Sequence, residues 1–158
     1  MKEAVVQDYG ATWLRRARRE RAVLRARLDR LVDTYEMRFM GQFESAQWTS
    51  RFCQQVLSCP EQWVGPLGAC LSRLDFSPVL RDEVAIMHPG TAVRGVLVMP
   101  TGLLMASLDA VCRELGPHLA FGDTGGRFGL SFEVDDQGNR LRHWGLAPAM
   151  APVWPGSA

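Results

Sequence analysis

The chain has 158 residues, of which 47% are apolar and 22% are charged. This length corresponds to one ordinary domain, and the apolar content is sufficient for a buried core, which excludes a disordered or fibrous chain. No apolar run approaches the roughly 18 residues that a membrane-spanning helix needs, and the N-terminus lacks the apolar segment of a secretory signal. We therefore expect a single domain over residues 1–158 that is cytoplasmic and does not enter the membrane.

The net charge of +1 conceals a strongly basic segment near the N-terminus. Residues 14–30 hold eight arginines against two acidic residues, so this segment carries +6 and the remainder of the chain carries −5. Such a pattern is typical of a nucleic-acid-binding surface or of the solvated outer face of a helix. Because all but one of the 18 basic residues are arginine, which indicates compositional bias, we favour the solvated face and do not expect nucleic acid as a partner.

The basic segment belongs to a long helix predicted over residues 12–40, with Thr12 as its N-cap and Gly41 just beyond its end. Small and apolar residues recur at heptad-like steps along one face of this helix. A homodimer formed through that face is the oligomer that the pattern would permit. The residues of the face are Leu14, Ala17, Leu24, Leu28, Leu31 and Tyr35.

The next segment, residues 48–57, is ambiguous. Trp48, Phe52 and Val56 fit a helical repeat but also occupy alternate positions of a strand, so the spacing alone does not decide. Residues 59–68 are rich in proline and glycine, which indicates a loop.

Two apolar runs, residues 80–87 and 93–99, flank a Pro-Gly pair and predict a β-hairpin. A helix is predicted from Thr101, as its capping residue, to Leu115, where Gly116 and the following proline end it. Residues 121–126 are expected to form a loop because of their glycines.

A second hairpin is predicted from residues 127–134 and 140–146, around a polar turn at 135–139. The order of helices and strands predicts an α+β fold, an antiparallel sheet with helices packed on it. The sheet and any ligand pocket would occupy residues 47–150.

The sequence shows no pattern of metal ligands and no nucleotide motif. Cys53, Cys59 and His88 have irregular spacing, and no Cys-x-x-Cys pair occurs, so we expect free thiols, no metal and no cofactor. The glycines of residues 122–126 lack the Lys-Ser/Thr of a phosphate-binding loop.

Two arginines stand at apolar strand runs. Arg81 and Arg94 could each have its guanidinium in water at a strand edge, or each could hold a ligand carboxylate. His88, His118 and His143 are dispersed and belong to no recognisable hydrolase motif.

Four segments together resemble the chorismate pyruvate-lyase family. Leu80–Pro100 resembles that family's strand opening with Leu-Arg-Glu, its tight turn and its next strand, and Leu108–Leu119 resembles its helix and Pro-Leu-Gly turn. Leu141–Trp154 is similar to the last strand and its proline-rich end, and Leu31–Phe39 is similar to the motif after the first helix.

The resemblance implies a small, cofactor-independent enzyme that converts chorismate to 4-hydroxybenzoate and pyruvate. The implied fold is an antiparallel sheet of about six strands, with residues 47–57 as one strand and helical flaps over a buried pocket. Arg81 falls on the arginine that holds the substrate carboxylate, and Arg94 lies near a second arginine of the family. Tyr35 falls on a pocket-lining position, and Leu119 falls on a backbone contact in the turn.

The chain departs from this family at the catalytic glutamate, where it has Trp144. His143, the neighbouring residue, could relay the proton if its side chain faced the pocket, but strand neighbours face opposite sides and only one of the two can enter. The sequence leaves three outcomes: the same lyase with a shifted acid, a related reaction on a small aromatic or cyclic carboxylic acid, or ligand binding without catalysis. From a different class, an interaction module that uses the arginine-rich helix is the alternative.

Overall fold

The computed structural model describes residues 2–28, 36–88 and 90–149, with side chains from residue 12 onward except that of residue 93. Within these ranges, seven strands form one antiparallel sheet in the order β1-β4-β3-β5-β6-β7-β2. The predicted α+β class and the antiparallel pairing are confirmed, although the sheet has seven strands rather than about six. The strands are β1 (Arg38–Phe39), β2 (Gln62–Val64), β3 (Glu83–Met87), β4 (Leu97–Pro100), β5 (Leu119–Asp123), β6 (Gly129–Asp135) and β7 (Gly138–Trp144).

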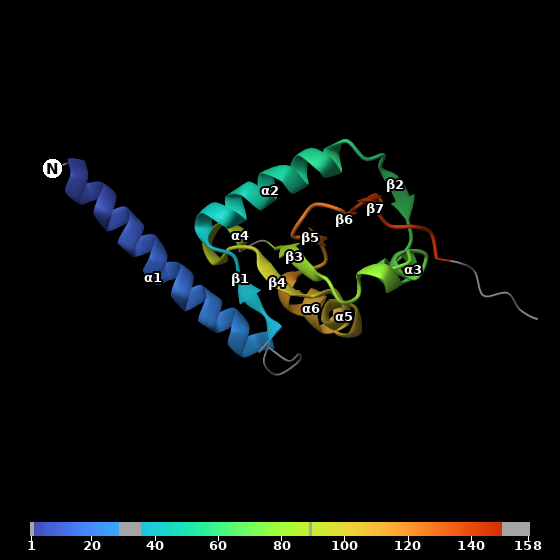
Figure 1. Ribbon diagram of the computed structural model, residues 1–158, viewed down its shortest axis with the longest axis horizontal. Coiled ribbons are helices and arrows are strands. Elements are labelled where there is room, and N and C mark those ends of the chain that lie inside the picture. Colours follow the sequence, from blue (N-terminus) through green and yellow to red (C-terminus); the bar gives the residue numbers. More distant parts are fainter. Residues whose placement is uncertain (1, 29–35, 89, 150–158) are drawn as a thin grey trace, which may run out of the picture.

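Helices cover the sheet on two sides. Figure 1 shows α2 on one side of the strands and the α5–α6 pair on the other, while α1 lies along the body and its N-terminal half extends away from it. None of the helices in the described ranges combines the length and the apolar character that crossing a membrane requires. The helices are α1 (Lys2–Leu28), α2 (Gln42–Leu57), α3 (Leu67–Leu71), α4 (Thr91–Arg94), α5 (Thr101–Ala106) and α6 (Leu108–Leu115).

The two faces of the sheet have separate apolar cores. On one face, Ile86 and Phe121 pack with Val111 of α6 and with Leu24 and Leu28 of α1. All five side chains are fully buried, which gives this face the larger core. The C-terminal half of α1 is thereby fixed to the body by apolar burial.

On the opposite face, α2 packs on the central strands. Trp48 and Phe52 of α2 contact a cluster that includes Ala85 and Val98 of the sheet. Helix α2 is amphipathic, and Ser45, Trp48 and Phe52, spaced three and four residues apart, are buried. The strand that the family resemblance implies for residues 47–57 is therefore wrong, because this spacing buries one face of a helix.

Both predicted hairpins are present. Strands β3 and β4 pair with Ala85 opposite Val98, and β6 and β7 pair with Ser131 opposite Arg142. The first hairpin begins at Glu83 rather than residue 80, and its connection contains the short helix α4 instead of a tight turn.

The N-terminal helix differs from its prediction over residues 12–40. It begins at Lys2, its described part ends at Leu28, and Arg38–Phe39 forms an edge strand paired with β4. Met37 and Phe39, two residues apart, pack against the larger core, whereas Met40 packs against the core on the opposite face, which is the period of two of a strand.

The face proposed for dimerisation serves a different purpose within one chain. Ala17, Leu24 and Leu28 are at most 1% exposed, and Leu24 and Leu28 pack into the protein's own core, whereas Leu14 is 51% exposed. Leu31 and Tyr35, the last members of that face, lie outside the described residues.

Two predicted loops contain strands. Residues 121–126 include the end of the central strand β5, in which a Cβ at Gly122 would meet the Phe128 carbonyl oxygen at 2.7 Å, so this glycine permits close strand contact. Residues 59–68 include the edge strand β2. The helix predicted over residues 101–115 is interrupted at Ser107, and Thr101 donates its hydroxyl to the Asp82 carbonyl oxygen rather than capping the helix.

Candidate ligand-binding site

A cavity of about 430 Å³ lies between the C-terminal half of α2, the turn after β5 and the end of β7. This volume is within the range of about 300–1,000 Å³ that is usual for small-molecule sites. We call it the aromatic cavity. It is lined chiefly by Trp48, Arg51, Phe52, Gln55, Asp123, Gly126 and Trp144.

Three aromatic rings form a continuous wall. Trp48 and Phe52 are one helical turn apart on α2, and their rings stack with centroids 4.9 Å apart and planes inclined by 22°. The ring of Trp144, from β7, lies 5.4 Å from that of Phe52, centroid to centroid, at 52°. Trp48 and Phe52 are only 3% and 5% exposed, so the partly exposed indole of Trp144 provides most of the apolar surface that this wall offers to a flat ring.

The polar edges of both indoles are fixed by the turn that follows β5. Trp48 donates its Nε1–H to the carbonyl oxygen of Asp123 at 3.1 Å, and Trp144 donates its Nε1–H to the carbonyl oxygen of Gly126 at 3.2 Å. The two rings are therefore held from one short segment of backbone. A displacement of this turn would move the rings of Trp48 and Trp144 together.

Glycines make the space that Trp144 occupies. A Cβ at Gly129, on the neighbouring strand β6, would overlap the indole ring of Trp144. Gly145, directly after Trp144, has φ of +73° and lies against the backbone of Arg127, so a side chain would be strained there. The two glycines thus leave room for the indole beside β6.

The turn itself is anchored by a charged cluster. The carboxylate of Asp123, only 3% exposed, accepts hydrogen bonds from the backbone N–H of Arg127 and from its Nε, the latter at 2.7 Å. The same guanidinium reaches Asp82 at 2.9 Å. The hydrogen bond to Asp123 and the charges of Asp123 and Asp82 raise the pKa of Arg127 above its usual value. The cluster ties the turn to the start of β3.

Among the described residues that line the cavity, Arg51 is the cation without an ion pair. Arg51 lies on the same side of α2 as Trp48 and Gln55, three and four residues away, and its side chain is exposed. Among the described residues that line the cavity, the ionisable side chains are Arg51 and Asp123, and the Asp123 carboxylate is already engaged by Arg127. This arrangement can bind a ligand that carries an anionic group on a flat ring, but the described residues of its lining include no carboxylate without a partner and no histidine or lysine.

The residues predicted from sequence do not converge on this cavity. Arg81 is exposed in the turn before β3, and Arg94 lies in α4 with its Nε 3.4 Å from Glu20 of α1. Leu119 is 1% exposed and begins β5 in the core, rather than forming a turn. None of these three lines the aromatic cavity, and Tyr35 lies outside the described residues.

The choice between His143 and Trp144 is resolved by the pleat of β7. Trp144 enters the aromatic cavity, whereas His143 does not line it and faces the other side with Leu141. The Nδ1 atom of His143 is buried without a hydrogen-bond partner among the described residues. His143 is thus not placed to transfer a proton in this cavity.

The described ranges contain no cluster of three or more metal-ligating side chains. All four cysteines are free thiols, and burial raises the pKa of Cys70 and of Cys112 above the usual range. Cys53, Cys59 and His88 form no cluster of this kind.

Sequence reasoning missed Arg51 as a site residue, although it noted the aromatic residues around it. The signal was present in the spacing of Trp48, Arg51, Phe52 and Gln55, which share one face only if the segment is a helix. Comparison with protein-family models and with curated proteins finds no match to this chain.

Proposed function

We propose that this protein binds a small aromatic or cyclic carboxylic acid in the aromatic cavity. The ring of the ligand packs against Trp48, Phe52 and Trp144, and its carboxylate pairs with Arg51. The observation that carries the proposal is the wall of three fixed rings with one free guanidinium beside it.

The chemistry of the cavity supports this ligand class. A guanidinium remains charged at every physiological pH and can hold a carboxylate through two parallel hydrogen bonds. The same class of ligand follows from the resemblance to the chorismate lyases, but the cation that we assign is Arg51 rather than Arg81. The resemblance and the cavity lead to the same chemistry by separate arguments.

Binding without turnover is the form of this function that the cavity favours. Elimination of pyruvate from chorismate, as the ring becomes aromatic, needs a positioned proton donor or carboxylate. The cavity's one carboxylate among the described residues, Asp123, is occupied by Arg127. We place this activity in the cytoplasm, which agrees with the four free thiols.

Two parallel measurements test the proposal. Titration with 4-hydroxybenzoate should change the tryptophan fluorescence, because Trp48 and Trp144 line the cavity, and should raise the melting temperature. Incubation with chorismate, followed by chromatography, should yield no 4-hydroxybenzoate or pyruvate above the uncatalysed rate. Product formation would contradict the non-catalytic form, and absence of any fluorescence or thermal response to either acid would contradict the binding function.

A further inference from the structure

The arginines of α1 fall into two sets with different surroundings. Arg21 donates to the backbone carbonyl oxygens of Arg94 and Met40, and Arg25 donates to that of Met37. Both guanidinium groups also lie over the ring of Phe39, about 5.5 Å from its centroid. These two arginines fasten the helix to the body.

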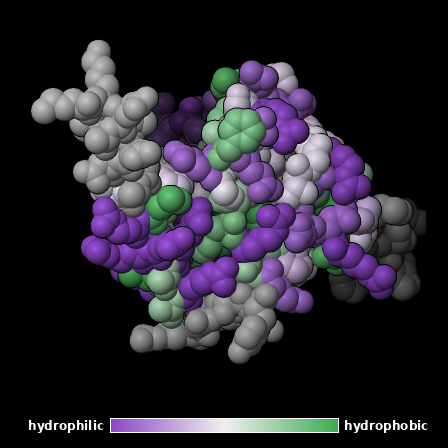
Figure 2. Space-filling model, turned by 60° about the vertical axis from the view of Figure 1, so that its left-hand side comes forward, coloured by the Kyte–Doolittle hydropathy of each residue, from purple (hydrophilic) through white to green (hydrophobic). Residues whose placement is uncertain are grey.

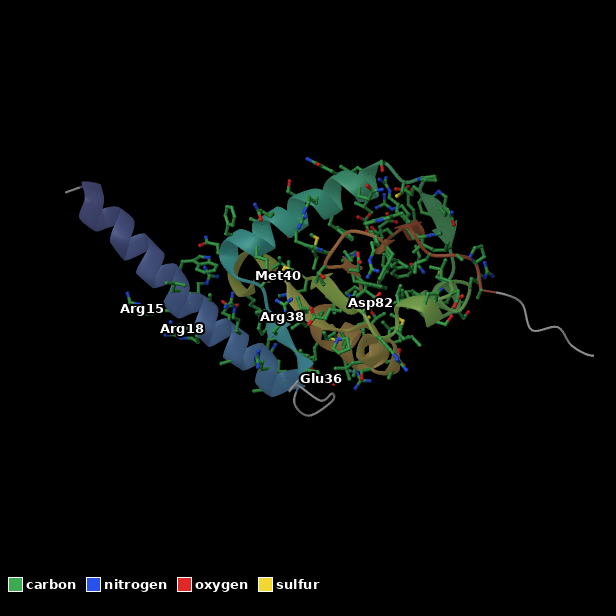
Figure 3. All side chains as sticks on the ribbon, viewed as in Figure 1. Arg15, Arg18, Glu36, Arg38, Met40 and Asp82 are labelled. Carbon is green, nitrogen blue, oxygen red and sulfur yellow. The ribbon has the colours of Figure 1, made fainter. Side chains whose placement is uncertain are left out.

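The second set projects into solvent. Arg15, Arg18, Arg19 and Arg27 are exposed and form no hydrogen bond or ion pair with any residue in the described ranges, while exposed Arg16 pairs only with Glu20, 3.3 Å away. We call these five residues, Arg15, Arg16, Arg18, Arg19 and Arg27, the arginine surface. Figure 3 shows Arg15 and Arg18 directed away from the sheet. The turned view of Figure 2 shows hydrophilic residues interspersed with apolar ones on this side of the molecule.

The arginine surface surrounds the exposed half of the helix instead of forming one stripe. With about 100° of rotation per residue, Arg18 lies on one flank and Arg16 and Arg27 lie on the other. Arg15 and Arg19 point outward between the flanks. Toward the C-terminal end of α1, the positions that point most directly outward are Ala22 and Ala26. Both residues are small and exposed.

We propose that the arginine surface binds duplex DNA, with α1 lying in the major groove. This groove is about 12 Å wide and accepts one α-helix, whose two flanks then face the two phosphate backbones. Cations on both flanks suit phosphates on both sides, and the alanines let the helix approach the groove floor. A flat acidic protein surface would meet only one side of the helix, so it explains fewer of the five arginines.

The extent of the surface matches such a contact. Arg15 and Arg27 are about 18 Å apart along the helix axis at about 1.5 Å per residue. That length covers about five base-pair steps at about 3.4 Å each. The composition of the sequence alone favours a solvated helix face. The hydrogen bonds of the structure show that Arg21 and Arg25 fasten α1 to the body, which leaves the arginine surface for phosphate.

Fluorescence anisotropy with a labelled mixed-sequence duplex of about 20 base pairs tests the proposal in the full chain. With the three flank arginines, Arg16, Arg18 and Arg27, on phosphates, the logarithm of the association constant should fall with the logarithm of salt concentration with a slope of about −3. The triple variant Arg15, Arg18 and Arg19→Gln removes one flank arginine and the two that face the groove floor, so it should lose at least about tenfold in affinity at 0.1 M salt and should have a slope nearer −2. Glutamine keeps a high helix propensity, and circular dichroism checks that α1 persists.

The matched control changes three exposed arginines elsewhere, Arg73, Arg81 and Arg113→Gln, with the same loss of charge. It should bind the duplex within about twofold of the unmodified chain and keep its slope. Equal losses in both triple variants, or no binding at 50 mM salt, would overturn the proposal. Equal affinity for the matching single strand would exclude groove binding, and equal affinity for polyglutamate would assign the surface to an acidic protein instead.

Discussion

The indole N–H of Trp48 donates to the backbone carbonyl oxygen of Asp123 at 3.1 Å, while the carboxylate of the same aspartate holds Arg127. One residue therefore connects α2, the turn after β5 and, through Arg127, Asp82 before β3. The wall of the aromatic cavity and the anchor of its turn meet at Asp123.

Asp123→Asn should lower the free energy of unfolding by about 1–3 kcal/mol, because hydrogen-bond donors of Arg127 would lose an ionised acceptor in a nearly buried position. Urea denaturation measures the change. Asp136→Asn, in the exposed turn between β6 and β7, is the control and should alter stability by less than about 0.5 kcal/mol. Equal effects of the two substitutions would show that the cluster does not anchor the turn.

Gly129→Ala should displace the indole of Trp144, because the added methyl group would overlap that ring. We expect weaker binding of 4-hydroxybenzoate and a lower melting temperature, both from the altered cavity wall. Gly125→Ala is a suitable comparison, since its Cβ would meet only an Asp123 carboxylate oxygen at an ordinary 3.6 Å. If Gly129→Ala bound 4-hydroxybenzoate as well as Gly125→Ala does, the position of the Trp144 indole would not matter for ligand binding.

The attachment of α1 to the body is tested by Leu24→Ala. Leu24 is fully buried between α1 and the sheet, so the substitution should cost about 2–5 kcal/mol of unfolding free energy. Val23→Ala, whose native side chain is 45% exposed, should change stability by less than about 0.5 kcal/mol. Chemical denaturation of both variants distinguishes a docked helix from one that extends freely in solution, for which the two losses would be similar and small.

We expect the fold to lose stability at mildly acidic pH because His88 becomes protonated there. Burial lowers its pKa below the usual value of about 6.5, and the charge of Arg94 acts in the same direction, while the hydrogen bond to the Gly95 carbonyl oxygen raises it. With Nε2 facing that carbonyl oxygen at 3.1 Å, Nδ1 accepts the N–H of Gly90 at 3.2 Å, and a proton on Nδ1 would oppose this donor.

The unfolded chain therefore binds a proton at His88 before the folded chain does. The stability that neutral His88 contributes is present above about pH 6.5 and is lost as pH falls from there through the lower pKa of the folded state. Melting temperatures measured between pH 7.5 and 5 should show a decline that is reduced in His88→Gln and retained in His118→Gln, a change at an exposed histidine. Identical pH profiles for the unmodified chain, His88→Gln and His118→Gln would show that His88 does not cause the decline.

The hairpins were predictable because their turns carry strong local chemistry. The polar turn at Asp135 is one example, since its carboxylate accepts the Gln137 N–H at 2.8 Å, as in an Asx turn. Strand β5 was missed because Gly122 and Asp123 read as loop residues. Their actual roles, close approach to Phe128 and a buried charge cluster, depend on residues distant in space and cannot be read from local sequence.

The candidate site was missed for a similar reason. Trp48 and Phe52 fit both a strand and a helix, and only the packing of α2 on the sheet selects the helix that places Arg51 beside them. The sequence indicated Arg81 and Arg94 as candidate carboxylate-binding residues because they lie at apolar runs. Arg81 lies in a turn and Arg94 pairs with Glu20, and neither environment is visible in the one-dimensional spacing.

The most direct test of the proposed function compares Arg51→Gln with Arg113→Gln, an exposed arginine on α6, in fluorescence titrations with 4-hydroxybenzoate and its neutral amide. A charge-assisted contact predicts that Arg51→Gln binds the acid about tenfold more weakly than Arg113→Gln does, whereas both variants bind the amide as the unmodified chain does. If Arg51→Gln and Arg113→Gln bound the acid with equal affinity, the cavity would not recognise a carboxylate through Arg51 and the account would be contradicted.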